Sequence, residues 1–447
     1  MPVKVCDALC GFGKTSACIK MMNERVDTKF IFVTQFLSEV ERIKKGCSSR
    51  GFVSPDSNLK LGLTKLADIQ SMMLEGKNIA TTHSLFVSYT EEIKEIIREQ
   101  GYVLILDESV DIMCVSEMAE CDLDILKRGG AVEEDDAGMI MWTYDDYLKE
   151  DKGRFKEEML RAKSKNFLRF EEDFFFWSIP PELFTCFKEI YVLTYMFQAQ
   201  PLKSFFEIHN IEYEYIGVHT TETGYNFCDA SEMNRAVNLK DKIHILDDRK
   251  INAIGDGRTS LSFSWYRNAR RDEESAELER LRKNVANVFK NVYKAPSRET
   301  LWTTFKDYTQ MLRGNGYYGG FIPYNMRASN EYANRKYLAY CVNNFPRPME
   351  RRYYQAYGSD WDGDMYALSI LIQWVFRSAI RKGEEVWLYL PSERMRVLFK
   401  QWLDNLADGE DLTPVKYVKP RVRKPKTKIK KGKSSKQMKK NKEIKEI

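Results

Sequence analysis

Histidine is scarce in this sequence, and no cysteines are spaced for metal binding. The 447 residues include four histidines and nine scattered cysteines, with no C-x-x-C pair. These features argue against a structural zinc site and against a disulfide framework. No run of eighteen apolar residues occurs, which argues against a membrane-spanning helix. The chain begins with a segment that leads directly into a glycine-rich loop. We therefore expect no signal peptide, no membrane partner and a cytoplasmic location.

The overall composition is that of a folded protein, but its charge is unevenly distributed. Apolar residues make up 43% of the chain, enough for the cores of two or three domains. The net charge of +5 hides a basic end, because residues 416–447 carry fifteen Lys and Arg against two Glu and the rest of the chain carries −8. We expect residues 411–447 to form a disordered basic tail. Such a tail could attract nucleic acid or could simply keep the protein soluble.

Hydrophobic patterning predicts an α/β fold with two parallel-sheet domains. Strand-like runs alternate with helical stretches through the first 110 residues, as in a parallel sheet with crossover helices. The alternation stops over about residues 113–180, which are rich in charge and are interpreted as a helical insertion, and it then resumes. We therefore place a first domain at residues 1–204 and a second at residues 205–410. Strand-like runs in the second domain cover residues 242–246, 260–265, 301–305 and 386–390.

The segment from Ala8 to Thr15 has the pattern of a phosphate-binding loop. Its glycines would let backbone N–H groups close round a polyphosphate, and its lysine would place a positive charge on the β- and γ-phosphates. A strand-like run over residues 3–5 precedes the loop, and a helix-compatible run over residues 15–24 follows it. The alternative is a glycine turn before an ordinary helix. We predict that ATP is bound by Gly11, Phe12, Gly13, Lys14, Thr15 and Ser16.

Two carboxylates, Asp107 and Glu108, follow an apolar strand-like run over residues 102–106. The carboxyl ends of parallel strands meet at one edge of a sheet, so this pair should lie beside the phosphate loop. In phosphoryl-transfer sites the first such carboxylate holds Mg²⁺ and the second can polarise the attacking water. We predict that Thr15 and Asp107 bind the metal and that Glu108 acts in catalysis.

An apolar helical stretch over residues 369–381 carries a polar residue at every fourth position. The spacing would stack these side chains on one helix face. Burying two guanidinium groups there is costly unless an anion or a carboxylate meets them. A triphosphate in a cleft between the domains is one partner, and a salt bridge to Asp362 or Asp364 is the alternative. The four polar residues are Ser369, Gln373, Arg377 and Arg381.

Taken together, these motifs resemble those of superfamily 2 helicases of the kind encoded by bacteriophages. Residues 8–15 match motif I and Asp107-Glu108-Ser109 matches the Walker B motif II, whereas Leu193-Thr194 resembles motif III. Gln373 and Arg377 match the start of motif VI, Q-x-x-G-R-x-x-R. The sequence departs from that motif because Phe376 replaces the glycine and Arg381 falls one position late. The resemblance covers about residues 1–405.

The resemblance implies two RecA-like domains with ATP and Mg²⁺ in the cleft between them. Gln373, Arg377 and Arg381 would then assist catalysis, and Thr194 would couple the ATP state to the grip on nucleic acid. Residues 33–35 and 81–83 stand where motifs Ia and Ib contact the phosphate backbone, which implicates Thr34, Thr82 and His83.

The implied partners are single-stranded or duplex nucleic acid, with DNA favoured over RNA, and replication proteins. The implied activity is that of an ATP-dependent DNA helicase in phage replication or recombination, located in the host cytoplasm. Two alternatives remain open: a nucleic-acid-stimulated ATPase that does not separate strands, and a replication scaffold that binds NTP without hydrolysing it.

Two further features have simpler interpretations. The aromatic run over residues 174–177 could stack on bases, but we favour a role in the core because aromatic side chains dominate interiors. Arg394 and Arg396, near the last helical stretch, are expected at the surface.

Overall fold

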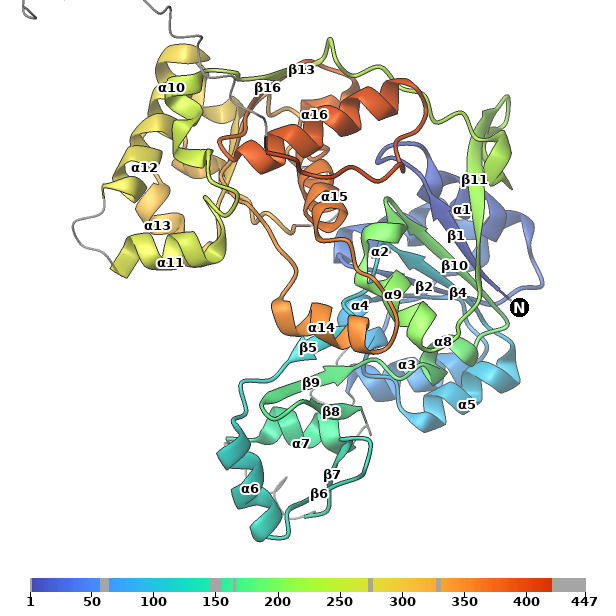
Figure 1. The fold of residues 1–447 in the computed structure, drawn as a ribbon. Helices are drawn as coiled ribbons and strands as arrows, with labels where there is room; N and C mark the ends of the chain where they lie inside the picture. Colours follow the sequence, from blue (N-terminus) through green and yellow to red (C-terminus); the bar gives the residue numbers. More distant parts are fainter. Residues whose placement is uncertain are drawn as a thin grey trace, which may run out of the picture. The chain divides into compact units, whose positions relative to one another are not determined.

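The computed structural model describes residues 2–56, 64–144, 154–163, 166–271, 276–326 and 331–419 (Figure 1). Residues Met1–Tyr417 form one unit and Val418–Ile447 a second. Most of the predicted disordered tail, from residue 420 onward, lies outside the described residues. None of the helices in the described part is long and apolar enough to cross a membrane.

A seven-stranded sheet forms the centre of the first domain. Its spatial order is β12-β11-β1-β10-β4-β2-β3, and every neighbouring pair is parallel except β11 and β12. The strands are β1 (Val3–Asp7), β2 (Phe30–Thr34), β3 (Ile79–Thr82), β4 (Val103–Asp107), β10 (Glu189–Thr194), β11 (Tyr213–Thr221) and β12 (Gly224–Asp229). The strand that leads into the glycine-rich loop is thus separated from the strand that ends at Asp107 by one strand, β10.

Helices cover both faces of this sheet, because its central strands are apolar on both sides. Buried residues of α1 and α2 pack with Phe30, Phe32 and Ile105 on one face. Buried residues of α3 and α5 pack with Ile31 and Leu104 on the other face. The helices of this domain are α1 (Lys14–Glu24), α2 (Leu37–Gly46), α3 (Lys65–Leu74), α4 (His83–Phe86), α5 (Glu91–Gln100), α8 (Glu182–Thr185) and α9 (Pro201–Ile208).

The first sheet extends past the domain boundary expected at residue 204. Strand β11 pairs with β1 in parallel and β12 closes the edge as an antiparallel hairpin, so the sheet reaches Asp229. The residues of β12 are half-buried or exposed, and β11 has only two buried positions. An edge hairpin of this kind gives no continuous apolar run, which is why the sequence placed the boundary too early.

In the residues that the structure describes, the insertion contains more strands than helices, which differs from the helical segment that the sequence predicts. Its segments pair as a three-stranded antiparallel sheet, β5-β9-β8, and a hairpin of β6 and β7. Residues 174–177 lie in a fully buried strand, which confirms their role in the core. The elements are β5 (Met113–Val115), α6 (Glu120–Arg128), β6 (Val132–Glu134), β7 (Ile140–Trp142), α7 (Lys156–Lys163), β8 (Phe167–Phe170) and β9 (Phe174–Ser178).

The second domain is built on a four-stranded parallel sheet with the order β13-β16-β15-β14. Its strands are β13 (Ile243–Ile245), β14 (Thr300–Thr303), β15 (Tyr337–Tyr340) and β16 (Val386–Tyr389). Its helices are α10 (Arg249–Asn252), α11 (Phe263–Arg271), α12 (Glu277–Asn287), α13 (Thr309–Leu312), α14 (Pro348–Ala356), α15 (Gly363–Val375) and α16 (Glu393–Ala407). The fold class, α/β with two RecA-like parallel-sheet domains, is confirmed.

One predicted strand of the second domain is instead the start of a helix. Residues 260–262 form a turn, and α11 begins at Phe263. The Ser262 hydroxyl accepts a hydrogen bond from the backbone N–H of Trp265 at 3.3 Å. This hydroxyl satisfies a donor at the helix start, which an apolar pattern alone does not reveal.

Candidate nucleotide site

The glycine-rich loop joins the carboxyl end of β1 to the start of α1, as a phosphate site requires. Gly11 has φ 91° and Gly13 has φ 86°, values that side chains rarely allow. A Cβ atom on Gly13 would lie 2.1 Å from Cδ1 of Tyr225 in β12. Only glycine therefore fits at position 13, because the edge hairpin presses an aromatic ring against the loop. No sequence motif indicated that Tyr225 packs against the loop.

The lysine of the loop lies over the loop backbone. The Lys14 ammonium group donates hydrogen bonds to the carbonyl oxygens of Ala8 at 2.5 Å and Leu9 at 3.4 Å, and its side chain is buried. Backbone N–H groups at the start of α1 and this ammonium group are the donors that polyphosphates prefer. The loop is therefore suited to hold an anion of this kind.

Asp107 lies beside the loop at the end of β4. The Thr15 hydroxyl donates to its Oδ1 at 3.2 Å, which brings together the two residues predicted to bind Mg²⁺. Burial, together with the nearby charge of Glu108, raises the pKa of Asp107 to about 7, whereas Lys14 and Thr15 act in the opposite direction. A cation bound here would favour the charged carboxylate. The oxygen atoms of Thr15 and Asp107 are ligands that a hard divalent cation such as Mg²⁺ prefers. The raised pKa of Asp107 also shows that its charged form would gain from such a cation.

Glu108 has an unusual backbone conformation, and one of its carboxylate oxygens has no hydrogen-bond partner among the described residues. Its φ is 68°, in the left-handed region that costs a residue other than glycine about 1–3 kcal/mol. Its backbone N–H donates to Leu193 O at 2.9 Å, which holds the turn against β10. Among the residues that the structure describes, its buried Oε2 atom accepts no hydrogen bond. This oxygen could therefore accept a proton from water.

Three residues of the first domain were expected to contact nucleic acid, and they differ in burial. They are Thr34, Thr82 and His83. Thr34 is 0% exposed and donates to Oδ2 of Asp107 at 3.3 Å, so its assignment as a nucleic-acid contact is wrong. The side chains of Thr82 and His83 are half-buried. The Thr82 hydroxyl lies 3.1 Å from that of Ser84, and Nε2 of His83 lies 3.2 Å from the backbone oxygen of Asp107. For these two residues the contact stays a prediction.

Thr194 links the phosphate loop to the segment that follows β10. Its backbone oxygen accepts a hydrogen bond from Ala8 N at 3.1 Å, and its hydroxyl accepts one from Nε2 of Gln200 at 2.7 Å. A residue with partners on both sides is placed to transmit a change at the loop. Its coupling role stays a prediction.

The helix that was expected to run to Arg381 ends at Val375, so the four polar residues do not share one helix face. Ser369 and Gln373 lie within α15, whereas Arg377 follows it and Arg381 lies in a short 3₁₀ turn. The backbone N–H of Ala379 donates to Arg335 O, a partner outside the helix. The helix has ended before this point, since the N–H groups of Arg377 and Ser378 donate three residues back, to Trp374 O and Val375 O. A local sequence pattern could not predict this change.

Both arginines nevertheless lie near the phosphate loop. Burial raises the pKa of the Cys10 thiol, the positive charges of Lys14, Arg377 and Arg381 lower it, and the negative charge of Glu108 raises it. All four charged groups are thus close enough to Cys10 to interact with it electrostatically. Arg377 is also buried. The second domain therefore contributes positive charge to the loop despite the broken helix.

The acidic residues considered as salt-bridge partners have other roles. Asp364 pairs with Arg394 at 2.7 Å. Asp362 caps the start of α15, where its carboxylate accepts hydrogen bonds from two backbone N–H groups.

Packing ties the loop to the second domain as well. Leu9 belongs to the buried cluster formed mainly by the second domain, and Cys10 and Phe12 pack against that cluster. Arg235, which follows β12, donates to the backbone oxygen of Asp7 at 2.7 Å and pairs with Asp411 at 2.7 Å. Nothing in the sequence pattern pointed to Arg235.

The fold and the site define the class as a two-domain Rossmann-like α/β protein with a glycine-rich loop at the carboxyl edge of its first sheet. A family model described as the YonV C-terminal Rossmann-like domain matches residues 237–403. The chain is 37% identical over 412 residues to the SPbeta prophage-derived uncharacterized protein YonV of Bacillus subtilis (strain 168), covering 90% of this chain and 99% of that protein. The chain therefore belongs to the YonV family.

Similarity to solved structures is distant. The S. tokodaii protein Xpd4 aligns with a TM-score of 0.46 and 14% identity, covering 90% of this chain and 94% of that one. The DUF1998 helicase MrfA, bound to DNA and AMPPNP, aligns with a TM-score of 0.32 and 9% identity, covering 90% of this chain and 48% of that one. These scores are too low to bear on function.

Proposed function

We propose that this protein is an ATP-dependent nucleic-acid motor of the helicase type. The observation that carries the proposal is the convergence of charged groups round the phosphate loop. Lys14, Glu108, Arg377 and Arg381 all act on the Cys10 thiol, and Thr15 meets Asp107 in the same site. Phosphoryl transfer needs such a set: donors for the phosphates, ligands for a metal ion, a base for water and positive charge for the transition state.

In this mechanism the loop and Lys14 bind the phosphates of ATP, while Thr15 and Asp107 hold Mg²⁺. The metal ion neutralises charge on the phosphates when it is bound. Glu108 accepts a proton from the attacking water through its spare oxygen. Arg377, assisted by Arg381 and Gln373, stabilises negative charge that develops on the γ-phosphate.

Nucleic acid is the proposed track of this motor, with DNA favoured over RNA. The B. subtilis relative is prophage-derived, which supports a bacteriophage setting. Within that setting we propose a role in phage replication or recombination in the host cytoplasm, with replication proteins as partners. Hydrolysis in the cleft would alternate the closure of the two domains and move the strand.

The ATPase rate with and without single-stranded DNA tests this proposal. We expect the wild-type rate to rise several-fold with DNA. Glu108→Gln should lower turnover about 100-fold or more while ATP binding persists, because it removes the base but keeps the shape. Glu95→Gln, at an exposed position in α5, is the matched control and should hydrolyse ATP normally.

Other outcomes would contradict the proposal in different ways. A wild-type rate that DNA does not change would exclude a motor. ATP binding without turnover would instead indicate a replication scaffold. Stimulation by DNA without separation of a partial duplex would restrict the activity to an ATPase that does not unwind.

A further inference from the structure

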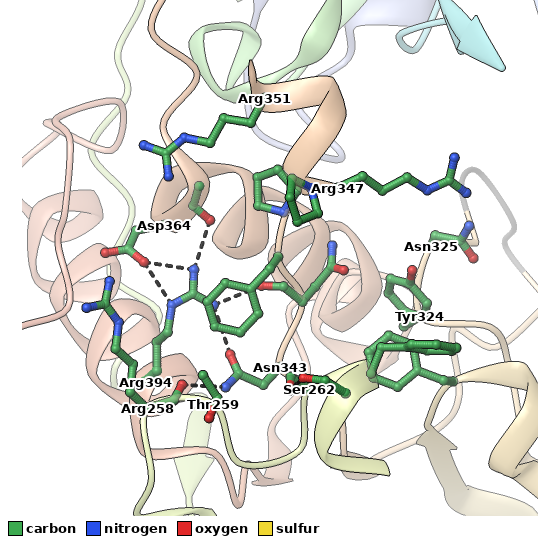
Figure 2. A pocket seen from close by; sticks show the side chains of 18 of the residues that line it. Arg258, Thr259, Ser262, Tyr324, Asn325, Asn343, Arg347, Arg351, Asp364 and Arg394 are labelled. Atoms are coloured by element: carbon green, nitrogen blue, oxygen red, sulfur yellow. Dashed lines mark hydrogen bonds and ion pairs between the residues drawn. The ribbon is translucent and has the colours of Figure 1, made fainter. Parts of the chain in front are cut away.

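A large cavity lies at the carboxyl edge of the second sheet, apart from the residues of the phosphate loop. Its volume is about 1430 Å³, above the roughly 300–1,000 Å³ of sites for small molecules. The segments that follow β14 and β15 form one wall, and α14 supplies another (Figure 2). A cavity of this size at a sheet edge suits an extended ligand.

The lining of this cavity is strongly basic. Eight positive residues face four acidic ones, in a chain whose residues before the basic tail carry a net negative charge. Such a local excess attracts polyanions and raises their association rate. The basic residues are Arg258, Arg267, Lys306, Arg347, Arg351, Arg352, Arg394 and Lys416, and the acidic residues are Asp307, Asp360, Asp362 and Asp364.

One of these arginines has a structural role and was wrongly expected at the surface. Arg394 is 1% exposed, and Nε and Nη2 of its guanidinium group bond the same oxygen of Asp364. It also donates to Oδ1 of Asn343 at 2.8 Å and to the backbone oxygens of Asn344 and Gly363 at 2.9 Å (Figure 2). Arg394 thus fixes the loop after β15 to the start of α15 and shapes the floor of the cavity.

Other cations in the cavity retain free donors. The side chains of Arg258, Arg267, Lys306 and Arg351 make no hydrogen bond or ion pair with any residue in the described ranges. In Figure 2, no dashed line joins the Arg351 side chain to the cluster of Arg394, Asp364 and Asn343. Guanidinium groups have five N–H donors in a fork that matches phosphate oxygens. These side chains can therefore bind an anion without first losing a protein partner.

Aromatic rings line the same cavity beside these cations. Phe263, the first residue of α11, is 47% exposed and meets Phe305 edge to face at 5.5 Å. Phe305 meets Tyr324 in the same manner at 5.3 Å. The exposed ring of Phe263 is supported by neighbouring aromatic rings. Unpaired bases stack on exposed aromatic side chains of this kind. Arginine beside aromatic residues is the combination that single-stranded nucleic acid recognises.

The wall that carries Arg351 is anchored to the first domain. Tyr353 of α14 packs against Phe170 at 5.3 Å and Phe176 at 4.8 Å, both in the insertion. The aromatic residues Phe263, Phe305 and Tyr324 on the other side of the cavity belong instead to the second domain. A relative movement of the domains would therefore change the width of the cavity, which would couple its grip to events at the phosphate loop.

We propose that this cavity binds an unpaired nucleic-acid strand, with Arg351 and its free neighbours on the phosphates and one base stacked on Phe263. The proposal rests on the proposed function for the motor context and deepens it by naming the form of the ligand. A duplex hides the faces of its bases, so only an unpaired strand can use both walls.

Fluorescence anisotropy of a labelled oligothymidylate, at several salt concentrations and without nucleotide, tests this site. Phe263→Ala should weaken binding about 5- to 150-fold without changing the salt slope, because it removes stacking but no charge. Arg351→Ala should weaken binding and reduce the slope of log K against log salt by about 0.7, the value for one contact to a single strand. A duplex of equal length should bind more weakly than the single strand.

Matched controls lie outside the cavity. Tyr318 is 66% exposed and the Arg298 side chain is 88% exposed, and neither lines the cavity. Tyr318→Ala and Arg298→Ala should bind the oligonucleotide like wild type. Phe263→Trp should restore the affinity that Phe263→Ala loses, which separates stacking from damage to the fold.

Several outcomes would overturn the site. These are wild-type affinity in both cavity variants, equal binding of duplex and single strand, or equally strong competition by poly-glutamate, which would indicate an acidic protein. The assay needs no turnover, so the two proposals fail separately. Binding that depends on Phe263 in a protein without ATPase activity would overturn the proposed function alone. A DNA-stimulated ATPase whose affinity for the strand ignores Phe263 and Arg351 would overturn this site alone.

Discussion

The phosphate loop and the basic cavity hold their positive charges in different ways. In the loop, Lys14 is buried and bonds two carbonyl oxygens. In the cavity, the side chains of Arg258, Arg267 and Arg351 make no hydrogen bond or ion pair with the described residues, and the volume available is about 1430 Å³. The loop is thus ordered in advance for one compact anion, whereas the cavity offers donors without partners among the described residues to a longer one.

The difference shows how one chain can serve two kinds of phosphate. A compact triphosphate gains from fixed backbone donors, since little entropy is lost when it binds. A strand that must move cannot be held by donors fixed to one position, and long arginine side chains can release one phosphate and take the next. Three experiments sharpen or break this comparison, and they follow in order of decreasing expected effect.

The largest effect should come from the second-domain arginine at the loop. Arg377→Ala should lower ATP turnover by about 100- to 1,000-fold, or roughly 3–4 kcal/mol, with ATP affinity nearly unchanged, because the side chain acts on the transition state. Steady-state kinetics and nucleotide titration measure the two effects, with Arg298→Ala as the control. Unchanged turnover would mean that Arg377 has a structural role and that the loop works without the second domain.

The close packing of the phosphate loop against Tyr225 can be tested by a matched pair of glycine variants. Gly13→Ala should lower the free energy of unfolding by about 2–3 kcal/mol, because it combines a positive φ with an overlap against Tyr225. Gly11→Ala meets no atom within 4 Å and should cost only about 1 kcal/mol. Urea unfolding measures both. Adding Tyr225→Ala to Gly13→Ala should recover the part due to overlap, and equal losses in the two single variants would contradict the packing.

The smallest effect concerns the buried carboxylate beneath the loop. Burial raises the pKa of Asp7 from its usual 3.8 to about 6, although the N–H groups of Phe197 and Met196 and the charge of Arg235 oppose the shift. The native state therefore holds this proton more tightly than the unfolded state does. The resulting stability is complete below pH 4 and is lost as the pH rises to about 6, at no more than about 1 kcal/mol per pH unit. Asp7→Asn should reduce the pH slope of stability, measured by urea unfolding from pH 4 to 7. Asp107, whose pKa is also raised, accounts for the part that remains, and an unchanged slope would exclude Asp7 as a source.

Much of the first site could be predicted because its residues are contiguous in the sequence. The loop from Gly11 to Thr15 follows β1 and the pair Asp107-Glu108 ends β4, and a parallel sheet brings such strand ends together. The role of Thr34 could not be predicted, because it depends on the pairing of β2 with β4. The end of α15 at Val375 likewise lay outside the local pattern, and beyond it the N–H of Ala379 donates to the distant Arg335 O.

The basic cavity had no signal in the sequence. Its residues come from segments as far apart as Arg258 and Lys416, and no spacing relates them. Charge is also ambiguous without a structure. Arg394 and Arg351 are both arginines near helix starts, yet one is buried in a bonded cluster and the other is free to bind. Only tertiary packing separates these two roles.

The central claim is that nucleotide binding at the phosphate loop is coupled to strand binding in the basic cavity. The affinity for a single strand in different nucleotide states tests this coupling most directly. Anisotropy of labelled oligothymidylate should give dissociation constants that differ by at least about fivefold between a non-hydrolysable ATP analogue and ADP, since allosteric coupling is typically 1–3 kcal/mol. Arg377→Ala should reduce that difference. Identical affinities in the two nucleotide states, with both nucleotides shown to be bound, would contradict the account.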